Sequence, residues 1–277
     1  MFTHPRIAII GDIGGHYEAF LKMLDYAGVD IESATIPAGL SIIQVGDLVH
    51  KGLDSDACIQ YAVRLLNNNP NQYVQLIGNH EAHYLGGPDV SHRSGVYRIS
   101  EASMEILTHW WAQGIMKLSV ALRTEIGDIL VTHGGLTKGF YENDLVSPQT
   151  AQETSRRLNS IDDVSAFRPG YIMTGIITLD AGPLCPRTGI ELLAPWLDSG
   201  SVLFHQIHGH EGVWWWPDAR WHDDVPQRIR DEAVVDWVSR QSWLDIGTHR
   251  IWSIDPVFGN NKPERVPNPL ILGGIIL

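Results

Sequence analysis

Residues 46–52 read Gly-Asp-Leu-Val-His-Lys-Gly and follow the apolar run Leu-Ser-Ile-Ile-Gln-Val at 40–45. The run predicts a buried strand, because it is short, apolar and ends at a glycine. Asp47 therefore stands at the carboxyl end of a strand, where open α/β folds assemble their sites. Lys51 brings a cation to the same turn. One Gly-Asp pair by itself indicates only a polar turn. It indicates a site only if similar polar residues follow other predicted strands.

Two other predicted strands end in the same way. Residues 7–10 run into Gly-Asp-Ile-Gly-Gly-His at 11–16, and apolar residues at helical spacing over 17–24 then predict a helix. Residues 73–77 run into Gly-Asn-His-Glu at 78–81. An Asp or Asn after a glycine at three successive strand ends indicates a shared site more strongly than turn chemistry alone.

The second half of the chain places histidines at equivalent positions. Residues 128–131 predict a strand that leads into Thr-His-Gly-Gly-Leu at 132–136. Residues 201–207 predict another, which ends in His-Gly-His-Glu at 208–211. An imidazole on a tight glycine loop suits a metal ligand. His208 lies two positions before His210 and remains an alternative ligand, because alternate residues of a strand share a face.

The remaining pattern is less specific. Residues 99–115 predict a helix, residues 249–254 a strand, and the apolar tail at 269–277 a final edge strand. We interpret residues 1–277 as a single domain, with the Pro- and Asp-containing stretch at 143–200 as a candidate cap or insertion.

Composition narrows the class of protein. The 277 residues are 44% hydrophobic and 19% charged, which predicts a packed globule. The net charge of −12 argues against a general binder of nucleic acid or membrane surfaces. An anionic substrate would then need local positive charge. Two cysteines cannot form a disulfide scaffold, and we find no signal peptide and no membrane-spanning run, so we expect a cytoplasmic protein.

The strand ends together supply five candidate metal ligands, which are Asp12, Asp47, Asn79, His133 and His210. Mixed oxygen and nitrogen donors suit borderline divalent ions such as manganese, iron or zinc. A central carboxylate can bridge two ions about 3.5–4 Å apart, the geometry that activates water and clamps a phosphoryl group. Two such ions would also offset the acidity of the chain where an anion must bind.

These motifs, in this order over residues 6–255, resemble the calcineurin-like metallophosphoesterases. Within that superfamily they are most similar to the phosphoprotein-phosphatase branch, with its bacterial protein phosphatases and diadenosine tetraphosphate hydrolases. The resemblance implies a four-layer α/β fold, in which a two-sheet mixed β-sandwich is flanked by helices. It also implies a dinuclear metal centre, with manganese as the first expectation, and hydrolysis of a phosphate ester by direct attack of a metal-activated water.

The resemblance also assigns roles to residues. Asp47 would bridge both ions, Asp12 would belong to the first site, and His80 would assist departure of the leaving oxygen. The side chains that would complete the second site are Asn79, His133 and His210. Arg187, between the last two histidine motifs, would bind the substrate phosphate.

The chain departs from the family pattern at two motifs. Gly14 stands where the family has a metal-binding histidine, so either His16 or a water molecule would fill that position. In the second motif Lys51 replaces an arginine, so it keeps a cation to bind the substrate phosphate but loses the bidentate fork. His50 replaces the carboxylate that would orient His80.

Several substrates fit these motifs: a phosphoprotein, a dinucleoside polyphosphate or a small phosphomonoester. Specificity would lie in the loops at 86–95 and 143–200. The departures also leave an alternative function, a degenerate domain of this family that acts as a non-catalytic binding module.

Overall fold

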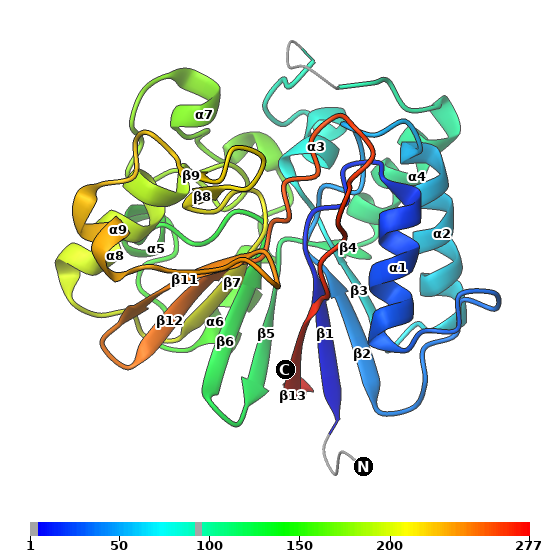
Figure 1. Ribbon diagram of the computed structural model, residues 1–277, viewed down its shortest axis with the longest axis horizontal. Helices are drawn as coiled ribbons and strands as arrows, with labels where there is room; N and C mark the ends of the chain where they lie inside the picture. Colours follow the sequence, from blue (N-terminus) through cyan, green and yellow to red (C-terminus); the bar gives the residue numbers. More distant parts are fainter. Residues whose placement is uncertain (1–4, 92–95) are drawn as a thin grey trace.

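The computed structural model describes residues 5–91 and 96–277 (Figure 1). Its first half alternates strands and helices, as the sequence predicts. The elements in order are β1 (Arg6–Ile10), α1 (Tyr17–Ala27), β2 (Leu40–Gln44), α2 (Ser55–Asn68), β3 (Tyr73–Leu76), α3 (Asn79–Ala82), η1 (His83–Leu85), α4 (Glu101–Ala112) and β4 (Met116–Lys117). The specificity loop at 86–95 lies partly outside the described residues.

The second half adds the elements β5 (Ser119–Thr124), β6 (Gly127–Thr132), α5 (Lys138–Asn143), α6 (Ala151–Leu158), η2 (Val164–Ala166), α7 (Tyr171–Thr174), η3 (Thr188–Leu193), α8 (Ala194–Ser199), β7 (His205–His208), β8 (Trp214–Trp215), β9 (Arg220–Trp221), α9 (Gln227–Glu232), β10 (Val234–Asp236), β11 (Gln241–Ile246), β12 (His249–Ser253) and β13 (Leu270–Ile276). Neither β5 nor β11 is among the predicted strands. The predicted helix at 99–115 is shorter than expected, because Ser100 caps its start by accepting a hydrogen bond from the Ser103 N–H and the left-handed Gly114 follows its end.

Eleven strands hydrogen-bond in the order β10-β11-β12-β7-β6-β5-β13-β1-β2-β3-β4, which makes one mixed sheet. The sheet folds on itself near β13, so that its two halves enclose an apolar layer (Figure 1). This layer contains Ile9 and Ile43 from one half and Val131 and Ile207 from the other. Helices α1, α2 and α4 flank the first half, and α5 to α9 flank the second (Figure 1). The predicted fold class, a mixed α/β sandwich flanked by helices, is confirmed.

The last strand corrects one prediction. The apolar tail was expected at a sheet edge, but β13 lies between β1 and β5 and pairs antiparallel with both. An apolar run predicts a strand but carries no information about its partners, and this one closes the gap between the two halves. The C-terminal strand is therefore central to the sheet.

The stretch at 143–200 lies in the connection between β6 and β7, which are parallel neighbours in the sheet. Helix α6 from this stretch packs against β5 and β6. The sheet runs through both strands without a break.

The order of the strands brings the motif loops together. Strands β1, β2 and β3 are parallel, and β6, β7 and β12 are parallel. Gly11, at the end of β1, lies so close to the end of β12 that an added Cβ would sit 2.2 Å from the carbonyl oxygen of Ile254. The glycine is needed there for the two halves to meet. The carboxyl ends of both sets of parallel strands therefore converge on one edge of the sheet, where the site forms.

Candidate metal centre

Four side chains from four loops converge at this edge. Asp47, His133 and His210 form a group whose donor atoms all lie within 4.8 Å of one another in the described residues. The Asn79 side-chain oxygen lies 3.0 Å from His133 Nε2 and 2.9 Å from His210 Nδ1. The structure thus brings together the four residues that were assigned to the second metal site.

The protonation state of His133 indicates that this arrangement suits a cation. His133 Nδ1 lies 3.0 Å from the carbonyl oxygen of Val45, which can only accept, so Nδ1 carries a proton. Burial lowers the pKa of His133 to about 4, so the ring is neutral and Nε2 has a lone pair. That lone pair faces the Asn79 oxygen and, at 3.5 Å, a carboxylate oxygen of Asp47. Three acceptors that point at one another call for a cation, so these residues fit a divalent metal ion.

Two motif glycines make room for the carboxylates. A Cβ added to Gly78 would lie 2.1 Å from Asp47 Oδ1, and one added to Gly209 would lie 2.1 Å from Asp12 Oδ1. Real Cβ atoms do not approach oxygen so closely. The Gly-Asn and Gly-His motifs therefore need glycine because an acid packs against each backbone.

Asp12 lies against the histidine loop. Both of its carboxylate oxygens accept from the backbone N–H of His210, at 3.0 and 3.1 Å. This contact ties the end of β1 to the loop after β7, and it places the acid predicted for the first site beside a predicted ligand of the second.

Glu81 fixes the backbone around Asp47, a role that the sequence analysis did not assign to it. Its carboxylate accepts from the N–H groups of Asp47, Leu48 and Gly78 at 2.7–2.9 Å. Asp47 has a positive φ of 55°, an uncommon conformation for a residue with a Cβ, and these bonds hold it there. The last residue of Gly-Asn-His-Glu is thus structural support for Asp47.

A third acid joins Asp12 and Asp47. Asp255 follows β12 and interacts electrostatically with both. Burial raises the pKa of Asp47 to about 7 and that of Asp255 to about 6, and burial together with these two neighbours raises the pKa of Asp12 well above its usual range. The positive charge of Lys51 opposes the rise at Asp47 and Asp255. Neighbouring acids repel one another when they ionise, and a bound cation would relieve this repulsion. Asp255 directly follows the strand predicted at 249–254, but it was not among the predicted site residues.

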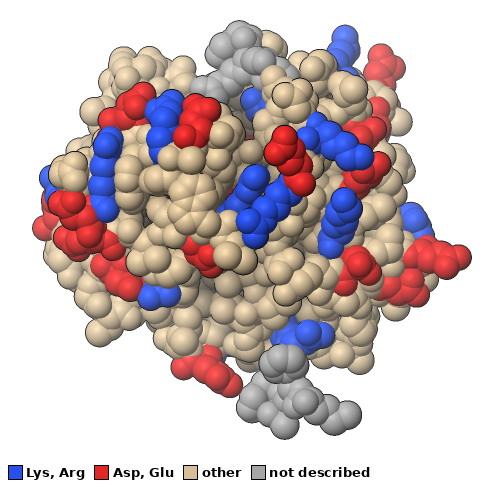
Figure 2. Space-filling view, in the orientation of Figure 1, with Lys and Arg blue, Asp and Glu red and all other residues tan. Residues whose placement is uncertain are grey.

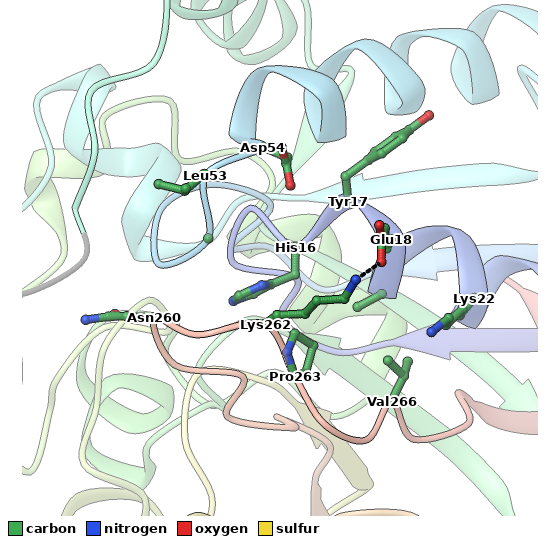
Figure 3. Close-up of a pocket in the computed structure, with 12 residues that line it drawn as sticks. His16, Tyr17, Glu18, Lys22, Leu53, Asp54, Asn260, Lys262, Pro263 and Val266 are labelled. Atoms are coloured by element: carbon green, nitrogen blue, oxygen red, sulfur yellow. Dashed lines mark ion pairs between the residues drawn. The ribbon is translucent and has the colours of Figure 1, made fainter.

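The side chain of His16 is not part of the group of acids and metal-ligand candidates. His16 Nε2 lies 2.9 Å from the Gly259 carbonyl oxygen, and the ring lines a separate pocket of about 190 Å³ (Figure 3). In that pocket an ion pair joins Lys262 to Glu18 at 2.5 Å. The expectation that His16 replaces the missing histidine is therefore not supported by its position.

Arg187 is also placed differently from its predicted role. Its guanidinium hydrogen-bonds both Asp224 oxygens, at 2.6 and 2.9 Å, and pairs with Glu211. Two acids therefore engage this cation within the protein. Lys51 instead lies near the acids and acts on both Asp47 and Asp255, and Arg240 also acts on Asp255.

Two of the histidines considered in the sequence remain, His80 and His208. The His80 backbone N–H donates to Asp47 Oδ1 at 3.0 Å, and His80 Nε2 lies 3.8 Å from Asp47 Oδ2, so the ring borders the metal centre. His208 lines a small cavity with Thr188 and Ser253 and lies outside the group that contains His210. The alternative that His208 replaces His210 is therefore not supported.

Acidic and basic side chains are interspersed on the face in Figure 2, without one continuous basic patch. Among residues 5–91 and 96–277, no helix has the length and apolar character needed to cross a bilayer. Both cysteines are buried and outside any disulfide.

Acids, an amide and imidazoles that meet at the strand ends of a mixed α/β sandwich are the arrangement expected of a metal-dependent phosphoesterase. Residues 5–256 match the model of the calcineurin-like phosphoesterase family, and the chain belongs to that family. The resemblance noted in the sequence is therefore confirmed at the level of the family.

Known proteins of several activities are similar to it. A zinc-dependent endopolyphosphatase of Saccharomyces cerevisiae is 31% identical over 78 residues, which are 28% of this chain and 21% of that protein. The catalytic subunit A1 of serine/threonine-protein phosphatase 2B from the same yeast is 35% identical over 79 residues, 28% of this chain and 13% of that protein. The chain thus matches about a fifth or less of the length of these relatives.

A solved structure supports the fold over the whole chain. The cold-active protein-tyrosine phosphatase of a psychrophilic Shewanella species superposes with a TM-score of 0.59 at 14% identity. The superposition covers 99% of this chain and 77% of that one. At this identity the likeness concerns the fold alone.

Proposed function

We propose that this chain hydrolyses a phosphate ester by direct attack of water on phosphorus at a dinuclear centre. The observation that carries the proposal is the convergence of the Asp47, Asn79 and His133 acceptors on one point. Divalent cations held there would polarise the phosphoryl oxygens and lower the pKa of a water molecule toward neutrality. Manganese is the ion that we propose first, because the donors are mixed oxygen and nitrogen.

The residues of the chain have separate tasks in this proposal. Asp47 belongs to one group with His133 and His210. It also interacts electrostatically with Asp12 and Asp255, so it is suited to bridge two ions. Lys51 would offset the charge of the phosphoryl oxygens. His80, which borders Asp47, would give a proton to the leaving oxygen. Attack and departure then need no covalent intermediate.

The substrate is a phosphorylated protein, a dinucleoside polyphosphate or a small phosphomonoester. The relatives include a phosphoprotein phosphatase and an endopolyphosphatase by their names, and each matches over little more than a quarter of the chain. We therefore propose the reaction and keep all three substrate classes as candidates for a screen.

The test combines activity with metal counting. Purified protein with added manganese should hydrolyse p-nitrophenyl phosphate, and Asp47→Asn should lower kcat/KM by at least about 100-fold. Asp128→Asn, which changes a half-buried acid paired with the exposed Arg123, is the matched control and should leave activity intact.

One observation favours a second candidate, a binding module without catalysis. Gly14 offers no side chain to the first site, and His16 points elsewhere. Elemental analysis separates the two functions: about two ions per chain after manganese reconstitution support the hydrolase. A chain that binds one ion or none and hydrolyses no phosphate ester would be the module.

A further inference from the structure

His50 stands where the family has an acid, and its surroundings differ from a solvated turn. The ring is completely buried, and the residue has a positive φ of 74°, as does its neighbour Lys51 at 62°. The backbone is held in this conformation by a hydrogen bond from the His50 N–H to Ser55 Oγ at 2.9 Å. A buried polar ring on a strained loop is costly unless its nitrogens are bonded.

Both ring nitrogens of His50 have partners. His50 Nδ1 lies 2.5 Å from His80 Nδ1, and His50 Nε2 lies 2.6 Å from the Tyr84 hydroxyl. His80 and Tyr84 are four residues apart on consecutive turns, α3 and η1, so both side chains can reach the same ring. The three groups form a chain of hydrogen bonds that starts beside Asp47 and ends at Tyr84.

A contact between two Nδ1 atoms needs a single proton between them. If both nitrogens carried one, the protons would clash, and if neither did, two lone pairs would repel. Burial, with the nearby His83 and Lys51 charges, lowers the pKa of His50 to about 4, so its ring is neutral and one of its nitrogens is an acceptor. The contact therefore fixes the tautomer of His80 relative to that of His50, and Tyr84 completes the pairing by donating or accepting as the tautomer requires.

We propose that His50, held by Tyr84, is the positioning residue for His80. The pair of His50 and Tyr84 replaces the carboxylate that this chain lacks at position 50. The inference rests on the proposed function of His80 as the proton donor to the leaving oxygen. A neutral imidazole accepts a weaker hydrogen bond than a carboxylate does, so the second bond to Tyr84 is needed to hold the ring.

Leaving-group dependence tests the proposal, because a weakly basic leaving group departs without a proton and a strongly basic one does not. His50→Phe, which keeps an aromatic ring without nitrogens, should lower kcat for phenyl phosphate by about 10–100-fold and for p-nitrophenyl phosphate by less than about 3-fold. Tyr84→Phe should give a smaller loss with the same selectivity. His50→Asn, whose amide reaches the Nδ1 position, should restore most of the phenyl phosphate activity.

A double-mutant cycle separates positioning from a general loss of structure. In a His80→Asn background the His50→Phe change should cause no further loss on phenyl phosphate. His83→Ala is the matched control, because that ring lies near His50, with centroids 6.4 Å apart, without a hydrogen bond between them in the described contacts. Equal losses on both esters, or additive losses in the cycle, would overturn the proposal.

A second readout does not depend on activity. The shared proton should give a strongly downfield imidazole resonance in the proton NMR spectrum of the native chain. It should vanish in His50→Phe and in His80→Asn and persist in His83→Ala. Its absence from the native chain would refute the inference even if hydrolysis is found, whereas a chain that shows the resonance but hydrolyses no ester would refute the proposed function alone.

Discussion

At the scale of single residues, Gly14 distinguishes this chain from the family pattern. Its φ is +56°, and an added Cβ would meet Lys51 Cβ at an ordinary 3.4 Å, so the position tolerates a side chain sterically but strains its backbone. A side chain there could supply the first metal site with the imidazole that His16 does not provide.

We therefore predict that Gly14→His raises the affinity of the first metal site for manganese by about 10-fold. It should lower the free energy of unfolding of the metal-free protein by about 1 kcal/mol, because the left-handed conformation disfavours a Cβ. Gly14→Ala has the same strain without the imidazole and is the control. Calorimetric titration and thermal unfolding measure both quantities. An equal affinity in the two variants would mean that the added ring does not reach the site.

At the scale of elements, the position of β13 has a consequence for folding. The strand fills the gap between β1 and β5, and the described sheet is continuous only through it. Without it, β1 and β5 would each expose a row of unpaired backbone groups and the apolar layer between the halves would open.

Truncation after residue 269 should therefore prevent folding and give insoluble protein, which circular dichroism and soluble yield would detect. Gly273→Ala, in the same strand at a position with no atom within 4 Å of the added Cβ, should fold normally. A soluble truncated protein with an unchanged Tm would show that β13 contributes little to the sheet.

At the scale of the whole molecule, the buried acids couple stability to pH and to metal. The pKa of Asp47 rises from 3.8 to about 7 on folding, so the unfolded chain binds fewer protons across that interval. Stability of the metal-free protein should therefore fall as the pH rises from about 4 to about 7. A divalent cation needs the ionised acid, so its stabilising effect should grow over the same interval.

The expected result is a difference in Tm between manganese-loaded and chelator-treated protein that is larger at about pH 7.5 than at about pH 5.5. Differential scanning calorimetry at both pH values measures it. Asp47→Asn should reduce the difference at the higher pH. A difference that is independent of pH would mean that these acids do not ligate the metal.

The sequence by itself determined the strand-and-helix alternation of the first half and the chemistry of the strand ends. Short apolar runs that stop at Gly-Asp, Gly-Asn or a histidine are local patterns, and Asp47, Asn79, His133 and His210 do meet as their order implied. The motif glycines at 78 and 209 are visible in the sequence, but the reason for them is tertiary, because an acid from another loop packs against each.

Tertiary structure alone decided how those ends are completed. The central position of β13, the approach of Asp255 to Asp12 and the enclosure of His50 by His80 and Tyr84 depend on contacts between residues far apart in the chain. The ion pairs that neutralise Arg187 belong to the same kind of information. A periodic pattern predicts which face of an element is buried, but it does not identify the element that packs against that face. The direction of a polar side chain depends on this packing partner, which only the tertiary structure shows.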